Sequence, residues 1–331
     1  MTAGVLRRLR AAAPAIVSDA IAVVVLVVLG FALPRAMPGD PIDALFAAGS
    51  TDLIADEVLR AQLAAYYGLD RPLLAQFGHH VAGLVSGNWG VSIRDGVPVT
   101  ELLAQRLPWT GLLAGGALLA GGVAGVALGA VAGWRRGSGL DTSLVAASAA
   151  LRSVPVFVTG SALIAVFAVG LGWFPLSGAT TRFADPGVPG RVGDVLAHLT
   201  LPALALAVPF AAGQFLLMRA GVVGELDSDH LLAGRASGLP WRLLRRRYAA
   251  RTALLPVTAA FGVALGTAVT ATVLVETVFR YEGVGLLMSE AIGYRDYPVL
   301  QGCFLLLTVG VLVTGRLADL VQLRLDPRLR R

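Results

Sequence analysis

Lysine is absent from this sequence, because all 27 basic residues of the 331-residue chain are arginine. A nucleotide-binding P-loop needs a lysine that reaches the phosphates, so the chain contains no P-loop. Covalent chemistry through a Schiff base on a lysine amine is excluded for the same reason. We therefore expect that the chain itself binds no cofactor and does not hydrolyse ATP.

Cysteine and histidine are scarce. The single cysteine, Cys303, lies in an apolar run and cannot form an intramolecular disulfide. Among the four histidines, the adjacent pair His79 and His80 points to different faces of a helix and has no third ligand at a useful spacing. The sequence also contains no HExxH, GxSxG or CxxC pattern. These absences predict no metal site and no catalytic residues, so we do not expect an enzyme.

Charge is scarce as well. Charged residues make up 15% of the chain and hydrophobic residues 56%, whereas a soluble domain carries about 25% charged residues. Six runs are long enough to cross a hydrocarbon layer about 30 Å thick. They cover residues 11–34, 107–134, 153–175, 195–218, 252–275 and 297–315. The sequence thus predicts an all-α, polytopic membrane protein with six transmembrane helices.

The arginines are unevenly distributed between the two sides that these helices define. If the N-terminus lies inside, the inside segments hold 18 arginines and six acidic residues, whereas the outside segments hold nine arginines and 14 acidic residues. Basic loops stay in the cytoplasm, so both termini are predicted to be cytoplasmic. The inside segments are residues 1–10, 135–152, 219–251 and 316–331.

The topology divides the chain into four parts. The first apolar run is longer than the core of a signal peptide and ends at Leu33-Pro34-Arg35, a poor cleavage site, so we expect a retained anchor. The parts are a cytoplasmic N-terminus at 1–10, a first transmembrane helix at 11–35, an external, partly helical subdomain at 36–106 and a core transmembrane domain at 107–331.

Two helices are expected in the external subdomain. Ser50-Thr51-Asp52 is suited to cap a helix that runs to Tyr67 and stops at Gly68. Pro72 is suited to open a second helix, which ends between Gly83 and Gly87.

Glycine recurs at every fourth position of the second apolar run, at residues 121, 125, 129 and 133. These positions share one helix face and allow another backbone to approach closely. We interpret the stripe as a site of internal helix packing; a sliding surface or a subunit contact is the alternative.

The loop at 219–251 is the most basic part of the chain, with seven arginines. Its middle reads HLLAGRASGLP, which predicts a short helix closed by Gly238 and the following Leu239-Pro240. We expect Gly238 to adopt a positive φ, which only glycine adopts cheaply. A small helix on the cytoplasmic face suggests a docking site for a partner inside the cell.

Few ionisable residues lie at membrane depth, and such residues are candidate functional sites. Arg152 precedes Ser153-Val154-Pro155, where the proline is expected to interrupt the helix. Glu276 closes the fifth apolar run. We place Arg152, Ser153 and Glu276 on a translocation pathway; interfacial or paired structural charges are the alternative.

A series of short motifs, taken together, resembles the permease subunit of binding-protein-dependent ABC importers of the dipeptide, oligopeptide or nickel type. The resemblance covers nearly the whole chain, in the order that the family shows. The motifs are Pro38-Gly39-Asp40-Pro41, Tyr67-Gly68-Leu69-Asp70, Gly87-Asn88-Trp89-Gly90, Ser153-Val154-Pro155, Trp173-Phe174-Pro175, His198-Leu199-Thr200-Leu201-Pro202, Val275-Glu276-Thr277, Arg295-Asp296-Tyr297-Pro298 and Leu325-Asp326-Pro327-Arg328.

The basic loop resembles the segment through which this family couples to its ATPases. The family pattern is kept at Arg235, Ala236, Gly238 and Leu239, and it changes at His230, Gly234 and Ser237, which replace tyrosine, alanine and lysine. In the wider form of the pattern, Leu232 replaces glutamate while Ala233 remains. The resemblance therefore implies ATPase coupling through Leu232, Ala233, Gly234, Arg235, Ala236, Gly238 and Leu239.

The resemblance also implies an assembly. It implies the type I permease fold of ABC importers in a bacterial cell membrane, contact with membrane lipid, a second permease subunit, two cytoplasmic ATPase subunits or domains that use ATP, and an extracytoplasmic substrate-binding protein. It implies no nucleic acid. An autonomous channel or secondary transporter is the alternative, but it needs its own filter or ion-coupling site. A membrane scaffold or enzyme is a third reading.

Overall fold

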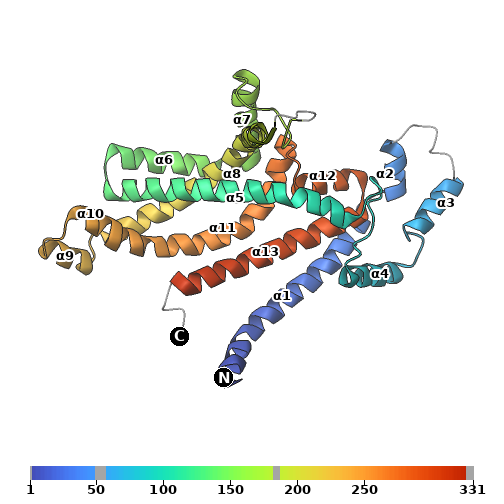
Figure 1. The fold of residues 1–331 in the computed structure, drawn as a ribbon, viewed down its shortest axis with the longest axis horizontal. Coiled ribbons are helices and arrows are strands. Elements are labelled where there is room, and N and C mark those ends of the chain that lie inside the picture. Colours follow the sequence, from blue (N-terminus) through green and yellow to red (C-terminus); the bar gives the residue numbers. More distant parts are fainter. Residues whose placement is uncertain (1, 49–56, 182–186, 326–331) are drawn as a thin grey trace. The chain divides into compact units, whose positions relative to one another are not determined.

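The computed structural model describes residues 2–48, 57–181 and 187–325. Within these ranges the regular secondary structure is helical, apart from one isolated antiparallel bridge between Val91 and Pro98, which confirms the all-α prediction. Figure 1 shows the helices in chain order. The chain divides into two compact units. Unit 1 comprises Met1–Pro108 and Gly283–Leu312, and unit 2 comprises Trp109–Glu282 and Val313–Arg331.

Four helices are long and apolar enough to cross a membrane, and two bent pairs raise the number to six if each pair is one span. The four lie in α1 (Thr2–Ala36), α5 (Val99–Trp134), α8 (Gly187–Glu225) and α13 (Tyr297–Leu325). One pair is α6 (Gly139–Ser153) with α7 (Val156–Leu163) and η2 (Ile164–Gly170), and the other pair lies within α11 (Ala250–Phe279). The polytopic class is thereby supported.

The break at Pro155 was predicted, and α6 was not. The two halves of the first pair meet at 101°, with Val154 extended ahead of the proline, as the ring of a following proline requires. Residues 139–152, which the sequence analysis assigned to an inside segment between two membrane spans, lie in the helix α6 and not in a loop. Ser138 caps this helix by accepting a hydrogen bond from the Asp141 amide at 3.2 Å.

Unit 1 contains two short helices that the sequence predicted, α3 (Glu57–Tyr66) and α4 (Leu73–Ser86). It also contains two that were not predicted, α2 (Pro41–Ala48) and α12 (Val284–Tyr294). Gly68 follows α3 with φ 65°, Pro72 precedes α4 and Gly87 ends it with φ 78°, so these predictions are confirmed. The cap predicted at Ser50-Thr51-Asp52 lies outside the described residues.

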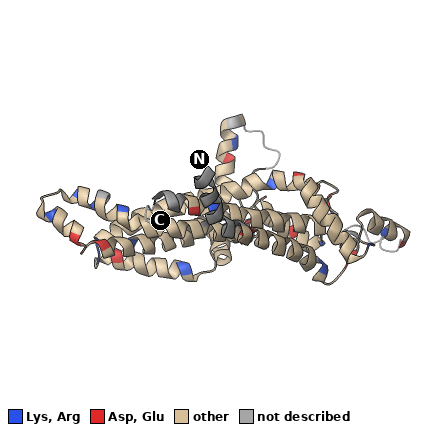
Figure 2. Cartoon of the chain, turned by 90° about the horizontal axis from the view of Figure 1, so that it is seen from below, with Lys and Arg blue, Asp and Glu red and all other residues tan. Residues whose placement is uncertain are grey.

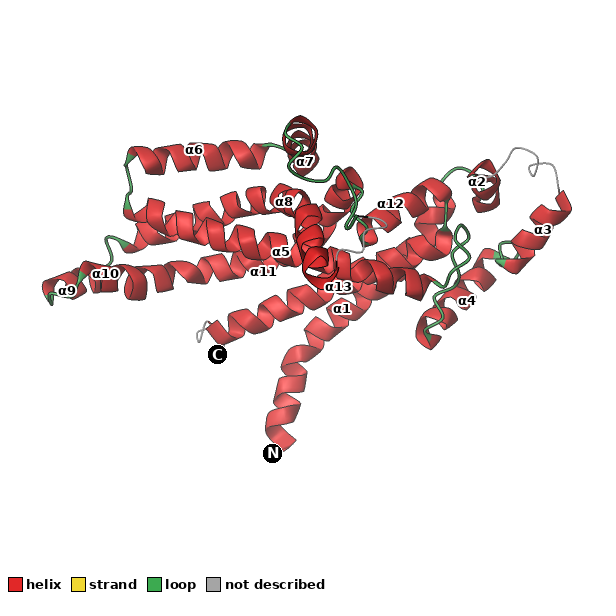
Figure 3. Ribbon diagram, turned by 45° about the horizontal axis from the view of Figure 1, so that its top comes forward, coloured by secondary structure: helices red, strands yellow, loops and turns green. Residues whose placement is uncertain are grey.

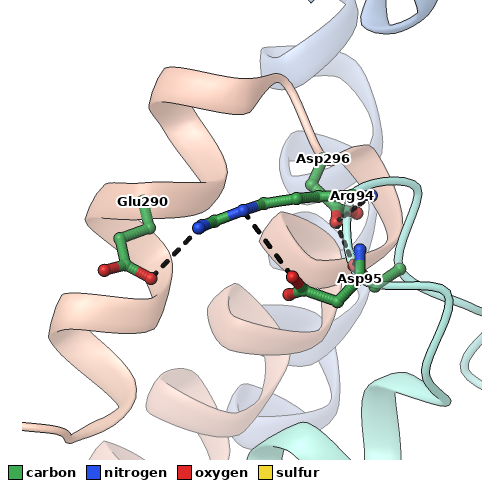
Figure 4. Close-up of polar contacts among 5 residues, drawn as sticks. Arg94, Asp95, Glu290 and Asp296 are labelled. Atoms are coloured by element: carbon green, nitrogen blue, oxygen red, sulfur yellow. Dashed lines mark hydrogen bonds and ion pairs between the residues drawn. The ribbon is translucent and has the colours of Figure 1, made fainter. Parts of the chain in front are cut away.

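A buried carboxylate organises the loop between α4 and α5. Asp296 is 2% exposed, and it accepts hydrogen bonds from the Ser92 hydroxyl at 2.5 Å and the Arg94 amide at 3.3 Å. Arg94 then reaches Glu290 on α12 at 3.4 Å (Figure 4). Burial raises the pKa of Asp296, and the Ser92 hydrogen bond opposes that shift. These contacts hold residues 92–95 against the start of α13.

In unit 2, the glycine stripe of α5 lies against the backbone of α8. A methyl group added at Gly121 or Gly129 would lie 2.6 Å from the carbonyl oxygen of Ala207 or Phe215, and one at Gly133 would lie 2.8 Å from the Val222 side chain. Gly125 approaches the Ala211 carbonyl and Gln214 in the same way. The stripe therefore serves internal packing.

Gly125→Ala tests this packing. We expect the added methyl group to push α5 from α8 and to lower the free energy of unfolding by about 1–3 kcal/mol, the usual cost of overpacking. Thermal unfolding of the purified protein measures the change. Gly115→Ala is the matched control on the same helix, because its methyl group meets no atom within 4 Å. Equal melting temperatures for the two variants would contradict the role of the stripe.

Candidate functional site

A short helix lies between α8 and α11 in the chain. After α8 ends at Glu225, Ser228 precedes α9 (Asp229–Ala236), and the chain returns through α10 (Trp241–Leu243) and η3 (Leu244–Ala249) into α11. Figure 3 shows α9 and α10 together at one end of this unit. Asp229 in the first turn and Arg235 in the last turn of α9 both interact favourably with the helix dipole and stabilise the helix. The predicted helix is confirmed.

The end of α9 is fixed by backbone geometry. Gly238 has φ 73°, as predicted. The Gly238 amide donates to the Arg235 carbonyl at 3.0 Å, and the Leu239 amide donates to the Gly234 carbonyl at 3.1 Å. This pair of bonds is the Schellman motif, which satisfies carbonyls that a helix end leaves open. The chain therefore leaves α9 in one defined direction.

The two faces of α9 differ. Leu231 is fully buried and Gly234 is also buried, whereas Leu232 is 50% exposed. Leu244 leaves no room for a side chain at position 234, because a methyl group there would lie 2.6 Å from the Cδ2 atom of Leu244. The outward face carries Leu232, Ala233, Arg235 and Ala236, and Leu239 is partly buried.

Aromatic residues support the outward face. The guanidinium of Arg235 lies 4.5 Å from the centre of the Trp241 ring, a cation–π arrangement. The Trp241 ring in turn packs edge-to-face against Trp134 at the end of α5, with ring centres 5.0 Å apart. Arg235 is thus held in place while it remains exposed.

Ion pairs join the helices beside α9. Arg219 on α8 donates from Nε and Nη2 to the two carboxylate oxygens of Asp141, at 2.6 and 2.8 Å. Asp141 is 2% exposed, and the Gly137 amide also donates to it at 3.0 Å. Two further ion pairs involve residues at the start of α9 or just before it. They are the exposed pair Arg136–Asp227 at 3.1 Å and the pair His230–Glu225 at 3.0 Å. Figure 2 shows charges of both signs at the end of the unit that carries α9.

A groove in unit 2 contains one of the predicted pathway residues. Exposed Arg152 lines a cavity of about 410 Å³ together with Pro209, Gly213 and Gln214 of α8 and Ala264 of α11. Gln214 is 3% exposed, and its Oε1 has no hydrogen-bond partner among the residues that the structure describes. A solute with a donor group can satisfy this oxygen. Sequence reasoning missed Gln214, although a lone amide in an apolar run is a recognisable signal.

The structure does not bring the other two pathway candidates into this groove. Ser153 is exposed at the end of α6, and its hydroxyl donates to the Ala150 carbonyl at 2.7 Å. Glu276 is fully buried and accepts a hydrogen bond from the Thr110 hydroxyl at 2.7 Å. In the described part of the chain, no three histidine, cysteine or acidic side chains are grouped so that they could hold a metal ion.

Known proteins resemble this chain over most of its length. Residues 125–331 match the family model described as "Binding-protein-dependent transport system inner membrane component". A probable peptide ABC transporter permease protein of Sinorhizobium fredii is 35% identical over 300 residues, which cover 91% of this chain and 92% of that protein. The dipeptide transport system permease protein of Escherichia coli K12 is 31% identical, with 91% and 93% covered. The oligopeptide transport system permease protein of Bacillus subtilis is 31% identical over 303 residues, which cover 91% of this chain and 93% of that protein.

Gly238→Ala tests the backbone-fixed end of α9. A left-handed conformation costs an alanine about 1 kcal/mol, so we expect the amides of residues 237–239 to exchange with deuterium roughly fivefold faster. Hydrogen-exchange mass spectrometry measures this rate. Gly224→Ala on α8 is the control, because its methyl group meets no atom within 4 Å and Gly224 has no positive φ. Unchanged exchange in Gly238→Ala would contradict the interpretation.

Proposed function

The chain belongs to the family of inner membrane components of binding-protein-dependent transport systems, and on that premise we propose that the solute it admits is a peptide. The support is that relatives with 31–36% identity over most of the chain are named as peptide, dipeptide or oligopeptide permeases. In the groove, the Arg152 guanidinium and the Gln214 amide suit the charged ends and amide groups of such a solute, while Phe210, Leu216 and Leu217 supply apolar walls.

The general function is settled by family membership. The chain is the transmembrane permease subunit of an ATP-driven importer, it spans the plasma membrane several times, and it has no ATPase site of its own, so it is not an enzyme. We propose that ATP is used by partner subunits and that this chain binds no cofactor. The absence of lysine supports this assignment.

Six membrane spans with both termini in the cytoplasm are the proposed topology. Each bent pair then counts as one span, and the external segment is the part of unit 1 between α1 and α5. The excess of arginine in residues 1–10, 219–251 and 316–331 supports this orientation. It places α9 on the cytoplasmic side.

Helix α9 is the proposed contact with an ATPase subunit. The single observation that carries this proposal is the contrast between its faces, because Leu231 and Gly234 are buried while Leu232, Ala233, Arg235 and Ala236 are exposed on a helix whose end is fixed. Gly238 and Leu239 set the direction in which the chain leaves. Two ATPases, a second permease and an extracytoplasmic substrate-binding protein complete the proposed assembly, in a type I permease fold surrounded by lipid.

Arg152 is the proposed solute contact in the groove. Its guanidinium suits a carboxylate, and its place beside Gln214 adds an amide. Ser153 and Glu276 remain pathway candidates, but neither lines the groove in this structure. Glu276 is buried, so a solute can contact it only if the helices rearrange during transport.

Uptake of a radiolabelled dipeptide by the complete assembly in proteoliposomes tests the function. We expect uptake that requires ATP and the binding protein, and we expect Arg152→Ala to lower it about tenfold, the loss that follows from one charge-assisted contact. Arg136→Ala is the matched control, because this arginine pairs with exposed Asp227. Peptide uptake that is absent in the wild type would refute the peptide assignment, and normal uptake in Arg152→Ala would remove that residue from the pathway.

Cysteine cross-linking tests the ATPase contact. In a Cys303→Ala background, single cysteines at Ala233 and Ala236 should cross-link to the ATPase, with a yield that changes on addition of ATP. Ser161→Cys on α7 is exposed as well and should not cross-link. If Ser161→Cys reacts with the ATPase and the α9 cysteines do not, the coupling assignment is wrong.

A further inference from the structure

Unit 1 contains a polar cavity that the pathway described above does not use. It has a volume of about 410 Å³, within the usual range for sites that hold small molecules. The end of α1, the turn between α3 and α4, residues 88–93 and the start of α13 form its walls. Under the proposed topology, the cavity lies on the outer side of the membrane.

The charged side chains that line the cavity are basic. Arg35 and Arg71 line it, and no aspartate or glutamate is among its lining residues. Burial, and then the neighbouring Arg35, lower the pKa of the lining residue His80 to about 4. His80 is therefore neutral at neutral pH, and the two arginines supply the charge. An anionic group is the ligand that this setting favours.

Arg35 is held in a fixed orientation. Its Nε and Nη2 atoms donate to Oε1 of Gln76 at 3.1 and 2.8 Å, and its Nη1 donates to the Phe31 carbonyl at 3.0 Å. The guanidinium lies 3.6 Å from the centre of the Phe31 ring. Gln76 is itself fixed, because its Nε2 donates to the carbonyls of Leu69 and Arg71 at 3.2 and 2.8 Å. A guanidinium has five N–H groups, so two of those of Arg35 remain for a ligand.

Gln301 adds an unused donor. It lies one turn into α13, lines the cavity and is 8% exposed. Its Nε2 is buried without a hydrogen-bond acceptor among the described residues. Leaving a buried donor without a partner costs free energy. If the Gln301 amide rotates toward the cavity, its Nε2 can donate to an acceptor on a ligand there. The rings of Tyr66, Trp89 and Tyr297 supply apolar walls around it.

We propose that this cavity binds the carboxylate end of a peptide on the outer side of the membrane, with Arg35 and Gln301 as the donors and the aromatic rings packed against the peptide. The assignment rests on the proposed function, in which peptides are the solute. It gives the permease a solute site of its own, separate from the groove at Arg152.

Equilibrium binding of radiolabelled alanyl-alanine tests the proposal. The sample is the purified complex of both permeases and the ATPases, without the binding protein. We expect alanyl-alanine to bind at least tenfold more tightly than alanyl-alanine amide, because the amide lacks the anionic group. Arg35→Gln and Gln301→Leu should each weaken binding about tenfold. Arg60→Gln, whose arginine pairs with exposed Asp40 and Asp43, should bind as the wild type does.

Several outcomes overturn the proposal. Equal affinity for the acid and the amide does so, as does wild-type affinity in Gln301→Leu, which decides the matter if Arg35→Gln does not fold. If no dipeptide binds but both variants weaken docking of the binding protein, the cavity receives that protein, and the proposal is wrong. Dipeptide uptake by the wild-type assembly distinguishes failure of this inference from failure of the proposed function. If uptake is intact but the cavity binds no dipeptide, only the cavity assignment is wrong. If there is no uptake, the proposed peptide-import function is wrong.

Discussion

The contact between α5 and α8 is the constraint on which the rest of unit 2 depends. Lipid offers no hydrophobic gain for bringing two helices together, so close backbone packing has to supply the attraction. The glycine stripe permits that packing, and the residues it touches include Gln214 at Gly125 and Arg219 at Gly133. The same contact therefore places the amide of the groove and the arginine that holds Asp141. A shift of α8 would move both.

Helix α6 links these two places. It begins beside Asp141, which Arg219 holds through two hydrogen bonds, and it ends at Arg152 and Ser153, beside the groove. Its 15 residues span about 22 Å as a helix. The helix therefore joins the Asp141–Arg219 pair at its first turn to Arg152, which lines the groove, at its last turn.

The sequence was sufficient where the chemistry is local. Gly238 and Pro155 act within a few residues, so the end of α9 and the break after α6 were predicted correctly. The helix α6 was missed because the arginines of residues 135–152 indicate only a side of the membrane, whereas packing against α8 and burial of Asp141 determine the structure of this segment. The cavity at Arg35 and Gln301 depends on residues far apart in the chain, and the burial of Glu276 beside Thr110 does so too. Neither leaves a signal in residue spacing.

In α9, the residues that fix the shape of the helix differ from those that form its exposed surface. Backbone bonds, the φ of Gly238 and the buried side of the helix set its form, and the side chains that face outward take no part in these bonds. Among the positions where the sequence departs from the pattern it resembles, Leu232 is exposed and can change without altering the helix. The Ser237 hydroxyl, in contrast, donates to the Ala233 carbonyl at 2.9 Å, and His230 pairs with Glu225 at 3.0 Å. Exposed residues such as Leu232 and Ala233 can thus vary while the backbone keeps the helix in one orientation, so the surface that α9 presents can change without a change in its shape.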